Sequence, residues 1–190
     1  MIHTNAVLDA KGLACPMPIV KAKKAMDGLE AGEVLEVQAT DKGSTADLKA
    51  WAEGIGHQYL GTIDEAGILK HYLRKASGEE KQEKKHPNTM TNEELLQKME
   101  SHSAFLLLDV RESAEFAFRH IPNALSLPLG DLEKRLNELN NEEEIFVICR
   151  TGNRSDLAAQ KLAGAGFRKV TNVIPGMSEW SGPVEKMVNQ

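Results

Sequence analysis

One stretch in the second half of the chain, Glu144 to Ser155, constrains the fold more than any other. The run from Ile145 to Ile148 is short, uninterrupted and rich in β-branched residues, which is typical of a parallel strand covered on both faces. Apolar residues at a helical spacing follow at positions 157, 158, 162 and 165. Between them the chain must turn sharply, and Gly152 is the residue that tolerates the required dihedral angles. The stretch therefore predicts a strand, a tight polar loop and a helix, with Cys149 at the turn.

The predicted loop favours a negatively charged sulfur at Cys149. Arg150 and Arg154 flank the cysteine, the start of a helix carries the positive end of its dipole, and the amides of a tight loop can face inward. A free thiol has a pKa of about 8.5, and such surroundings favour the reactive thiolate. We expect both arginines to recruit an anionic donor. The predicted substrate-binding residues are Arg150, Thr151, Gly152, Asn153 and Arg154.

Length and composition exclude several classes of function. The chain has 190 residues, enough for two domains, and a formal net charge of −5. It has no basic run with interleaved aromatic residues, so nucleic acid is a poor candidate partner. No apolar stretch approaches the ~18 residues of a membrane span, and the N-terminus lacks the pattern of a signal peptide. We therefore expect no membrane partner.

The cysteine and histidine content indicates the compartment and the cofactors. Cys15 and Cys149 are the only two cysteines and make no disulfide framework, so the expected location is the reducing cytoplasm. The 6 histidines are scattered without ligand spacing, which predicts neither a metal nor a cofactor.

Residues 1–75 predict a first small α/β domain. Strands are expected at 6–9, 34–39, 57–63 and 68–73. One helix should start near Pro18 and end at Gly32, because proline suits a first helical turn and glycine suits a helix end. Ser44 or Thr45 should cap a second helix that closes at Gly54. The predicted order is βαβαββ, a two-layer sandwich with two helices on one face of a small sheet.

A charged linker is expected at residues 76–90. Six of the twelve residues from Ala76 to Pro87 are Glu or Lys. Such a segment buries too little apolar surface to offset its ordering entropy, so it predicts a flexible or solvated connection.

Residues 91–190 predict a second α/β domain. Thr91 to Glu94 reads as a capping box at the start of a helix. Strands are expected at 104–109, 124–127, 145–148 and 169–174, with helical segments at 112–119, along the leucines of 129–139, after Arg154 and around Trp180. Strands that alternate with helices predict a parallel central sheet, and ligands bind beyond the carboxyl ends of such strands.

At these motifs the chain resembles two known families. The second domain resembles a single rhodanese domain. The matching residues are Asp109-Val110-Arg111-Glu112, His120-Ile121-Pro122 with Ala124, Cys149-Arg150-Thr151-Gly152-Asn153-Arg154-Ser155, and Gly176-Met177 with Trp180. The first domain resembles the TusA-like (SirA-like) sulfur carriers through Leu8-Asp9, Gly12-Leu13-Ala14-Cys15-Pro16-Met17-Pro18, and Ala39-Thr40-Asp41 before Ser44.

The resemblance implies a sulfurtransferase. Sulfane sulfur would pass from thiosulfate or a persulfide donor, through a persulfide on Cys149, to a thiol or protein-cysteine acceptor. Cys15 would be a second sulfur-carrying cysteine, and the two cysteines could meet within one molecule or across a homodimer. Asp109, Arg111 and His120 are expected to support the loop structurally.

Two alternatives stay open. The chain could be a non-enzymatic persulfide carrier and docking protein that a partner sulfurtransferase loads. It could also be a phosphatase, since cysteine-dependent phosphatases place a thiolate in a similar loop. The loop of such phosphatases has a cysteine, five further residues and then an arginine, whereas four residues separate Cys149 from Arg154. The shorter loop suits one sulfur atom better than a phosphoryl group.

Overall fold

The computed structural model describes residues 2–76, 84–101 and 103–187. These residues form two compact units, the first made of residues 2–76 with Met187 and the second of residues 84–101 and 103–186.

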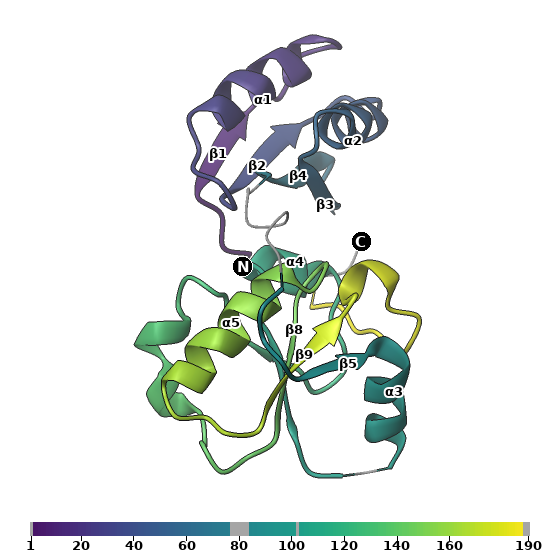
Figure 1. The fold of residues 1–190 in the computed structure, drawn as a ribbon. Coiled ribbons are helices and arrows are strands. Elements are labelled where there is room, and N and C mark those ends of the chain that lie inside the picture. Colours follow the sequence, from purple (N-terminus) through teal and green to yellow (C-terminus); the bar gives the residue numbers. More distant parts are fainter. Residues whose placement is uncertain (1, 77–83, 102, 188–190) are drawn as a thin grey trace. The chain divides into compact units, whose positions relative to one another are not determined.

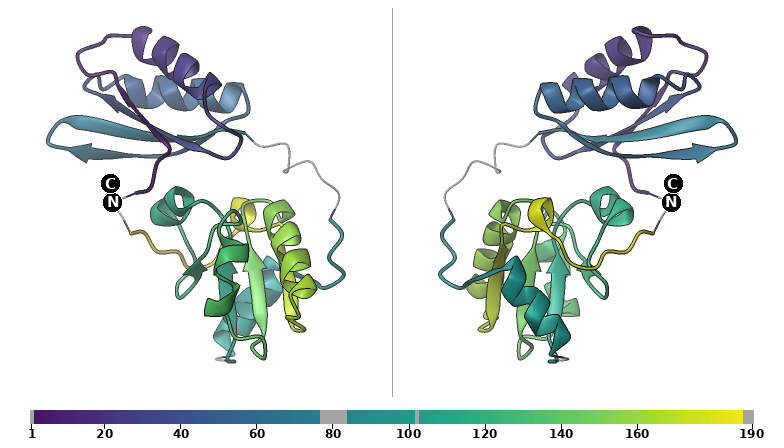
Figure 2. Two further views of the ribbon diagram at one scale, coloured as in Figure 1. Left: turned by 90° about the vertical axis from the view of Figure 1, so that its left-hand side faces the viewer. Right: turned by 90° about the vertical axis from the view of Figure 1, so that its right-hand side faces the viewer.

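The first unit is a two-layer sandwich (Figures 1 and 2). Its elements are β1 (Ala6–Asp9), α1 (Met17–Asp27), β2 (Val34–Ala39), α2 (Ser44–Gly54), β3 (Gln58–Glu65) and β4 (Ile68–Arg74). The sheet order is β1-β2-β4-β3, with β1 parallel to β2 and the other pairs antiparallel. Both helices cover the same face and bury Met26 and Leu48 against Leu35, Val37 and Leu73. The predicted βαβαββ order is confirmed.

Two helix boundaries in this unit differ from the predictions. Helix α1 ends at Asp27, before the predicted Gly32, and Gly32 instead donates its N–H to the carbonyl of Lys75 at 3.0 Å. Helix α2 begins at Ser44, but the Ser44 hydroxyl donates to the carbonyl of Asp41 at 2.5 Å and makes no side-chain cap. The hydroxyl also lies 2.9 Å from His71 Nε2, a partner on a distant strand.

The second unit has a five-stranded sheet in which every pair is parallel, as predicted. Its strands are β5 (Thr89–Thr91), β6 (Leu106–Asp109), β7 (Leu125–Ser126), β8 (Ile145–Ile148) and β9 (Val170–Ile174), in the order β5-β9-β8-β6-β7. The α-helices are α3 (Asn92–Glu100), α4 (Ser113–Phe118) and α5 (Asn153–Gly164). Helices α3 and α5 lie on opposite faces (Figure 1), so each face buries its own apolar cluster. The capping box at Thr91 and Glu94 is confirmed.

The predicted linker extends too far into the second unit. Residues 77–83 of that segment lie outside the described part of the chain. The backbone N–H groups of Lys85 and His86 each donate to the carboxylate of Asp156 at 2.9 Å, and the side chain of His86 is buried. Strand β5 then pairs with β9. The charged composition did not reveal that this segment belongs to the second unit, because its partners are polar groups of α5 and β9 and not apolar surface.

Two predicted helices are 3₁₀ turns. Of the leucines of 129–139, Leu132 lies on η2 (Leu132–Lys134) and Leu136 on η3 (Leu136–Glu138), and the segment near Trp180 is η4 (Met177–Glu179). The four leucines still pack against the core. A spacing of three or four residues fits both helix types, so it predicted the buried face but not the winding.

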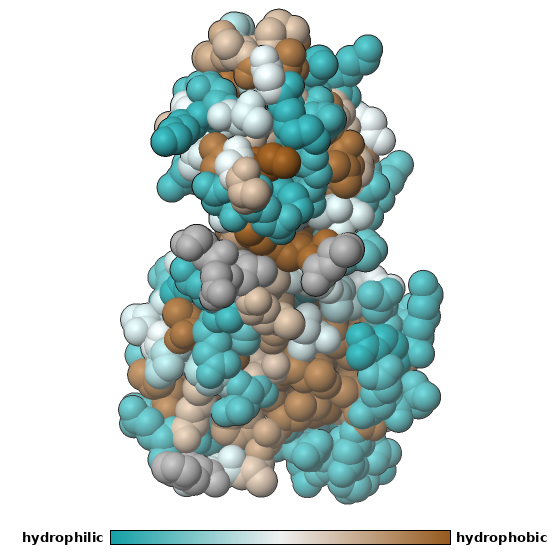
Figure 3. Space-filling model, turned by 180° about the vertical axis from the view of Figure 1, so that it is seen from behind, coloured by the Kyte–Doolittle hydropathy of each residue, from teal (hydrophilic) through white to brown (hydrophobic). Residues whose placement is uncertain are grey.

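The outer surface of the second unit is not uniformly polar. Seen from behind, it carries an apolar area between hydrophilic margins (Figure 3). Within the described ranges, none of the helices has both the length and the apolar character that crossing a membrane requires.

Candidate functional site

Cys149 lies at the carboxyl end of β8, between the ends of its two neighbouring strands. The carbonyl of Ile148 accepts the N–H of Val110 at 3.0 Å, and the carbonyl of Cys149 accepts the N–H of Met177 at 2.9 Å. Gly176 makes the second contact feasible, because a Cβ there would lie 2.5 Å from the Cys149 carbonyl oxygen. The chain leaving β8 is therefore held from both sides.

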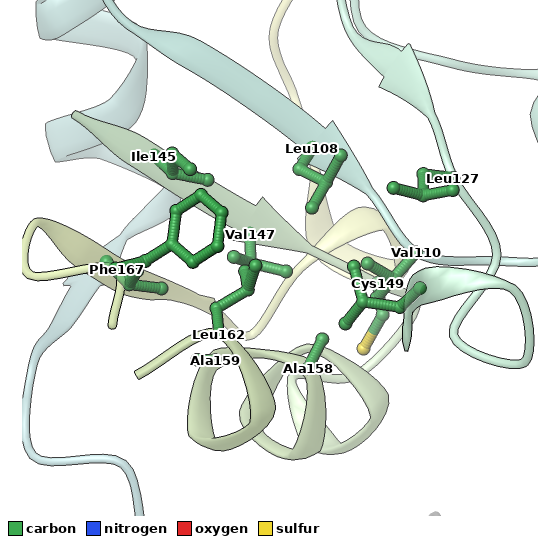
Figure 4. Packing of buried hydrophobic residues seen from close by; sticks show 12 residues of the cluster. Leu108, Val110, Leu127, Ile145, Val147, Cys149, Ala158, Ala159, Leu162 and Phe167 are labelled. Carbon is green, nitrogen blue, oxygen red and sulfur yellow. The ribbon is translucent and has the colours of Figure 1, made fainter. Parts of the chain in front are cut away.

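The Cys149 side chain has an apolar flank and a polar tip. It is 1% exposed and belongs to the cluster that includes Val110, Leu127 and Ala158 (Figure 4). Its Sγ accepts the backbone N–H of Gly152 at 3.1 Å, and the Ser155 hydroxyl lies 3.3 Å away. Gly152 has φ +87°, the left-handed conformation that lets the loop fold back on the sulfur. The Gly152 N–H is therefore a fixed donor at the tip of this buried sulfur.

The structure places Arg154 in a buried ion pair. Its guanidinium is buried and donates to both carboxylate oxygens of Glu115, at 2.6 and 2.9 Å. Burial alone would lower the pKa of Arg154, but the Glu115 carboxylate outweighs burial and raises it, with the charge of Cys149 acting in the same direction. A guanidinium engaged in this way ties the first turn of α5 to α4 and contributes positive charge near Cys149.

The other predicted loop residues lie nearer the surface. Arg150, Thr151 and Asn153 are half-buried, and Asn153 is the first residue of α5. The carbonyl of Arg150 accepts the N–H of Ser178 at 2.9 Å.

The predicted supporting residues bind one another and the backbone beside this loop. Asp109 accepts two-pronged hydrogen bonds from the Arg111 guanidinium, and Arg111 Nη2 also donates to the carbonyl of Arg119 at 2.7 Å. His120 Nδ1 donates to the carbonyl of Phe116 at 2.8 Å, and the two rings stack with centroids 3.9 Å apart.

Cys15 occupies a different environment, on the first unit just before α1. It is exposed, and the neighbouring Met17 and Val20 are 44% and 54% exposed. A hydrogen bond and the charge of Asp47 raise the pKa of the Cys15 thiol, with some further contribution from burial and from Asp41. These contacts therefore disfavour the thiolate of Cys15.

Four residues of these sites carried no predicted role: Asp47, Glu115, Ser155 and Asn172. Glu115 and Asn172 left a signal in the sequence. Each is a polar residue within a short apolar element, and a buried polar group requires a partner. Asp47 and Ser155 left no such signal, since both lie at ordinary polar positions of a first helical turn.

The two units and the families that they match define a class of protein, a chain that joins two sulfur-handling domains. Residues 6–75 match the family described as sulfurtransferase TusA, and residues 91–183 match the family described as rhodanese-like domain. The chain belongs to the family of proteins that join a TusA domain to a rhodanese-like domain, in that order.

Individual relatives agree with this assignment. The Bacillus subtilis protein named "Putative sulfur carrier protein YrkF" is 52% identical over 185 residues, which cover 97% of this chain and 100% of that protein. The sulfur carrier protein TusA of Allochromatium vinosum is 44% identical and matches 40% of this chain and 100% of its own. The crystal structure of a rhodanese-like domain protein from Staphylococcus aureus is 30% identical, covers 52% of this chain and 97% of its own, and superposes with a TM-score of 0.50.

Proposed function

We propose that the chain is a rhodanese-type sulfurtransferase that moves sulfane sulfur from thiosulfate or a persulfide donor through Cys149 to a thiol acceptor. The observation that carries this proposal is the position of Cys149 Sγ, which follows a parallel strand and lies 3.1 Å from the inward N–H of Gly152. Ligands of open parallel sheets bind at this edge.

The proposed reaction has two displacement steps. The Cys149 thiolate attacks the outer sulfur of thiosulfate, the sulfur–sulfur bond of the donor breaks, and sulfite leaves with the bonding electron pair. An acceptor thiolate then attacks the terminal sulfur of the Cys149 persulfide, and Cys149 leaves as the thiolate. In the first step the attacking Cys149 thiolate has the Gly152 N–H as a fixed donor in place of water, and in the second step the leaving Cys149 thiolate regains that donor. Because Cys149 is only 1% exposed, the loop must open to admit the donor.

Arg154 and Arg150 have different parts in this proposal. The buried Arg154–Glu115 pair keeps the first turn of α5 against α4 and so keeps Gly152 in place. Arg150, which is half-buried, is the residue that we expect to attract an anionic donor. Replacing Arg150 with alanine should raise the thiosulfate concentration needed for half-maximal rate more than it changes the maximal rate.

We further propose that Cys15 accepts sulfur and carries it to a protein cysteine. Its exposure and the apolar side chains of Met17 and Val20 beside it suit contact with a protein. Both cysteines are free thiols, so the proposal expects a reducing compartment such as the cytoplasm.

The carrier alternative is supported by the name of the Bacillus subtilis relative, a putative sulfur carrier protein, and by the burial of Cys149. The formation of thiocyanate from thiosulfate and cyanide separates the two functions. If the chain is a sulfurtransferase, the wild-type and Cys15→Ser forms should both form thiocyanate, and the Cys149→Ser form should not. A chain that only carries sulfur should show no turnover in any of the three forms.

A further inference from the structure

The polar groups around Cys149 compete for one hydrogen atom. Ser155 Oγ lies 2.6 Å from Asn172 Oδ1 and 3.3 Å from Cys149 Sγ, and both Ser155 and Asn172 are 0% exposed. Both neighbours are in position to accept from the hydroxyl, but a serine hydroxyl has a single hydrogen. It can therefore donate to only one of them at a time.

The orientation of Asn172 decides where this hydrogen rests. Asn172 Nδ2 donates to the carbonyl of Gly152 at 3.0 Å. A backbone carbonyl only accepts, so the amide nitrogen must face Gly152 and the amide oxygen must face Ser155. Oδ1 also only accepts, so its 2.6 Å contact with Ser155 Oγ needs the hydrogen of Ser155, whereas a protonated sulfur can supply its own. The hydrogen of Ser155 therefore belongs to Asn172, which leaves the lone pairs of Oγ available to a protonated sulfur.

We propose that Asn172 is a positioning residue that holds the Ser155 hydroxyl away from Cys149 until the sulfur ionises. In the thiol form, Cys149 S–H donates to Ser155 Oγ, whose own hydrogen goes to Asn172 Oδ1. When the thiol proton leaves to water, the hydroxyl turns from Asn172 to the sulfur, and the thiolate then accepts from both Ser155 and Gly152. The bond between Ser155 and Asn172 thus opposes ionisation.

The inference deepens the proposed function and rests on it, because the thiolate is the species that attacks the donor. Once Sγ has bonded to a second sulfur it is no longer the charged atom, and the hydroxyl can return to Asn172. The Ser155 hydroxyl would therefore stabilise the Cys149 thiolate only before a second sulfur has bonded to it. A test of ionisation, rather than of sulfur transfer, keeps the two proposals separable.

The test follows the ultraviolet absorbance of the thiolate against pH in a Cys15→Ser chain, with Cys15→Ser/Cys149→Ser subtracted. Asn172→Ala and Asn172→Val both remove the competing acceptor, and valine suits the buried strand if the alanine variant does not fold. We expect the midpoint of ionisation to move to lower pH by about half a unit to one unit, the worth of one hydrogen bond. Asn92→Ala is the matched control, because this buried amide bonds Gly176 and not Ser155.

A double-mutant cycle with Ser155→Ala identifies the cause of the shift. In the Ser155→Ala chain there is no hydroxyl to release, so replacing Asn172 should leave the midpoint unchanged. The proposal would be overturned if replacing Asn172 moved the ionisation midpoint equally with and without Ser155. It would also be overturned if Asn92→Ala moved the midpoint as far, or if the midpoint of the Asn172 variants stayed in place or rose. If the midpoint moves as expected but thiosulfate adds no sulfur to Cys149, the hydrogen-bond exchange stands and the proposed function fails.

Discussion

The guanidinium of Arg154 and the carboxylate of Glu115 form a buried ion pair with two hydrogen bonds, of 2.6 and 2.9 Å. The Arg154 side chain is 2% exposed and that of Glu115 is 0% exposed. The pair joins the first turn of α5 to α4, so the loop that bends around Cys149 is anchored to a second element. Such a pair is costly to break, because removing either partner leaves the other as a buried charge without a counter-charge.

Replacing Glu115 with glutamine should therefore destabilise the second unit by about 3–5 kcal/mol. The measurement is urea unfolding followed by Trp180 fluorescence in a Trp51→Phe chain, so that only the second unit reports. Glu138→Gln is the control, because Glu138 pairs with Arg135 at an exposed site and should cost less than about 1 kcal/mol. Equal losses in the two variants would contradict the structural role of the buried pair.

Replacing Gly152 with alanine should disrupt the loop itself. Gly152 has φ +87°, and a Cβ there would lie 2.6 Å from Ile174 Cγ2. Gly166→Ala is the matched control, since Gly166 has φ +97° but open space around it. We expect Gly166→Ala to cost about 1–2 kcal/mol from the left-handed backbone alone. Gly152→Ala should cost more, by about 1–3 kcal/mol of overpacking, and should abolish sulfur transfer. Unfolding and thiocyanate assays on the two variants check this, and equal behaviour would refute it.

Replacing Asp47 with asparagine should make Cys15 more reactive. Asp47 raises the pKa of the Cys15 thiol, so its loss should lower that pKa and increase the thiolate fraction near neutral pH. The rate of Cys15 alkylation, read by mass spectrometry in a Cys149→Ser chain, should rise. Glu53→Gln, an exposed position on the same helix, should leave the rate unchanged. A slower rate in Asp47→Asn would show that Asp47 promotes ionisation instead.

His71 should make the stability of the first unit depend on pH. The ring is 0% exposed and hydrogen-bonded on both nitrogens, by Ser44 and by Tyr59 with Thr62, and burial lowers its pKa to about 4. The unfolded chain binds this proton near the ordinary value of 6.5. The free energy of unfolding should therefore fall by about 2 kcal/mol as pH falls from 6.5 to 4, and this loss should level off at lower pH.

Urea unfolding of a Trp180→Phe chain at a series of pH values measures this slope through Trp51. His71→Gln should flatten the slope over that range, whereas His3→Gln, at an exposed histidine of the same unit, should not. An unchanged slope in His71→Gln would assign the pH dependence to other groups.

Periodicity predicted the elements better than it predicted their contacts. The uninterrupted, β-branched run from Ile145 to Ile148 is typical of a buried strand, and it forms the fully buried strand β8. The leucines from 129 to 139 share a buried face in either winding, so their spacing could not distinguish an α-helix from the 3₁₀ turns that are present. A pattern along one segment reports which side is buried, and little about the hydrogen bonds that the segment makes.

Contacts within the site could be predicted where the residues are close together in the sequence. Cys149 and Gly152 lie within one loop, so their contact follows from the sequence of that loop. The partner of Arg154 could not be found in the same way, because Glu115 is 39 positions away and meets Arg154 only through the packing of α4. Asn172 likewise reaches Gly152 from the next strand of the sheet. Long-range polar pairs of this kind need the fold before they can be assigned.

We propose that Cys149 is the residue that takes sulfane sulfur. To test this directly, the wild-type, Cys149→Ser and Cys15→Ser chains are incubated with thiosulfate, and the sulfur added at each cysteine is measured by mass spectrometry. We expect one added sulfur atom on Cys149 in the wild-type and Cys15→Ser chains, and none on Cys15 in Cys149→Ser. Sulfur on Cys15 in Cys149→Ser, together with an unmodified Cys149 in Cys15→Ser, would contradict it.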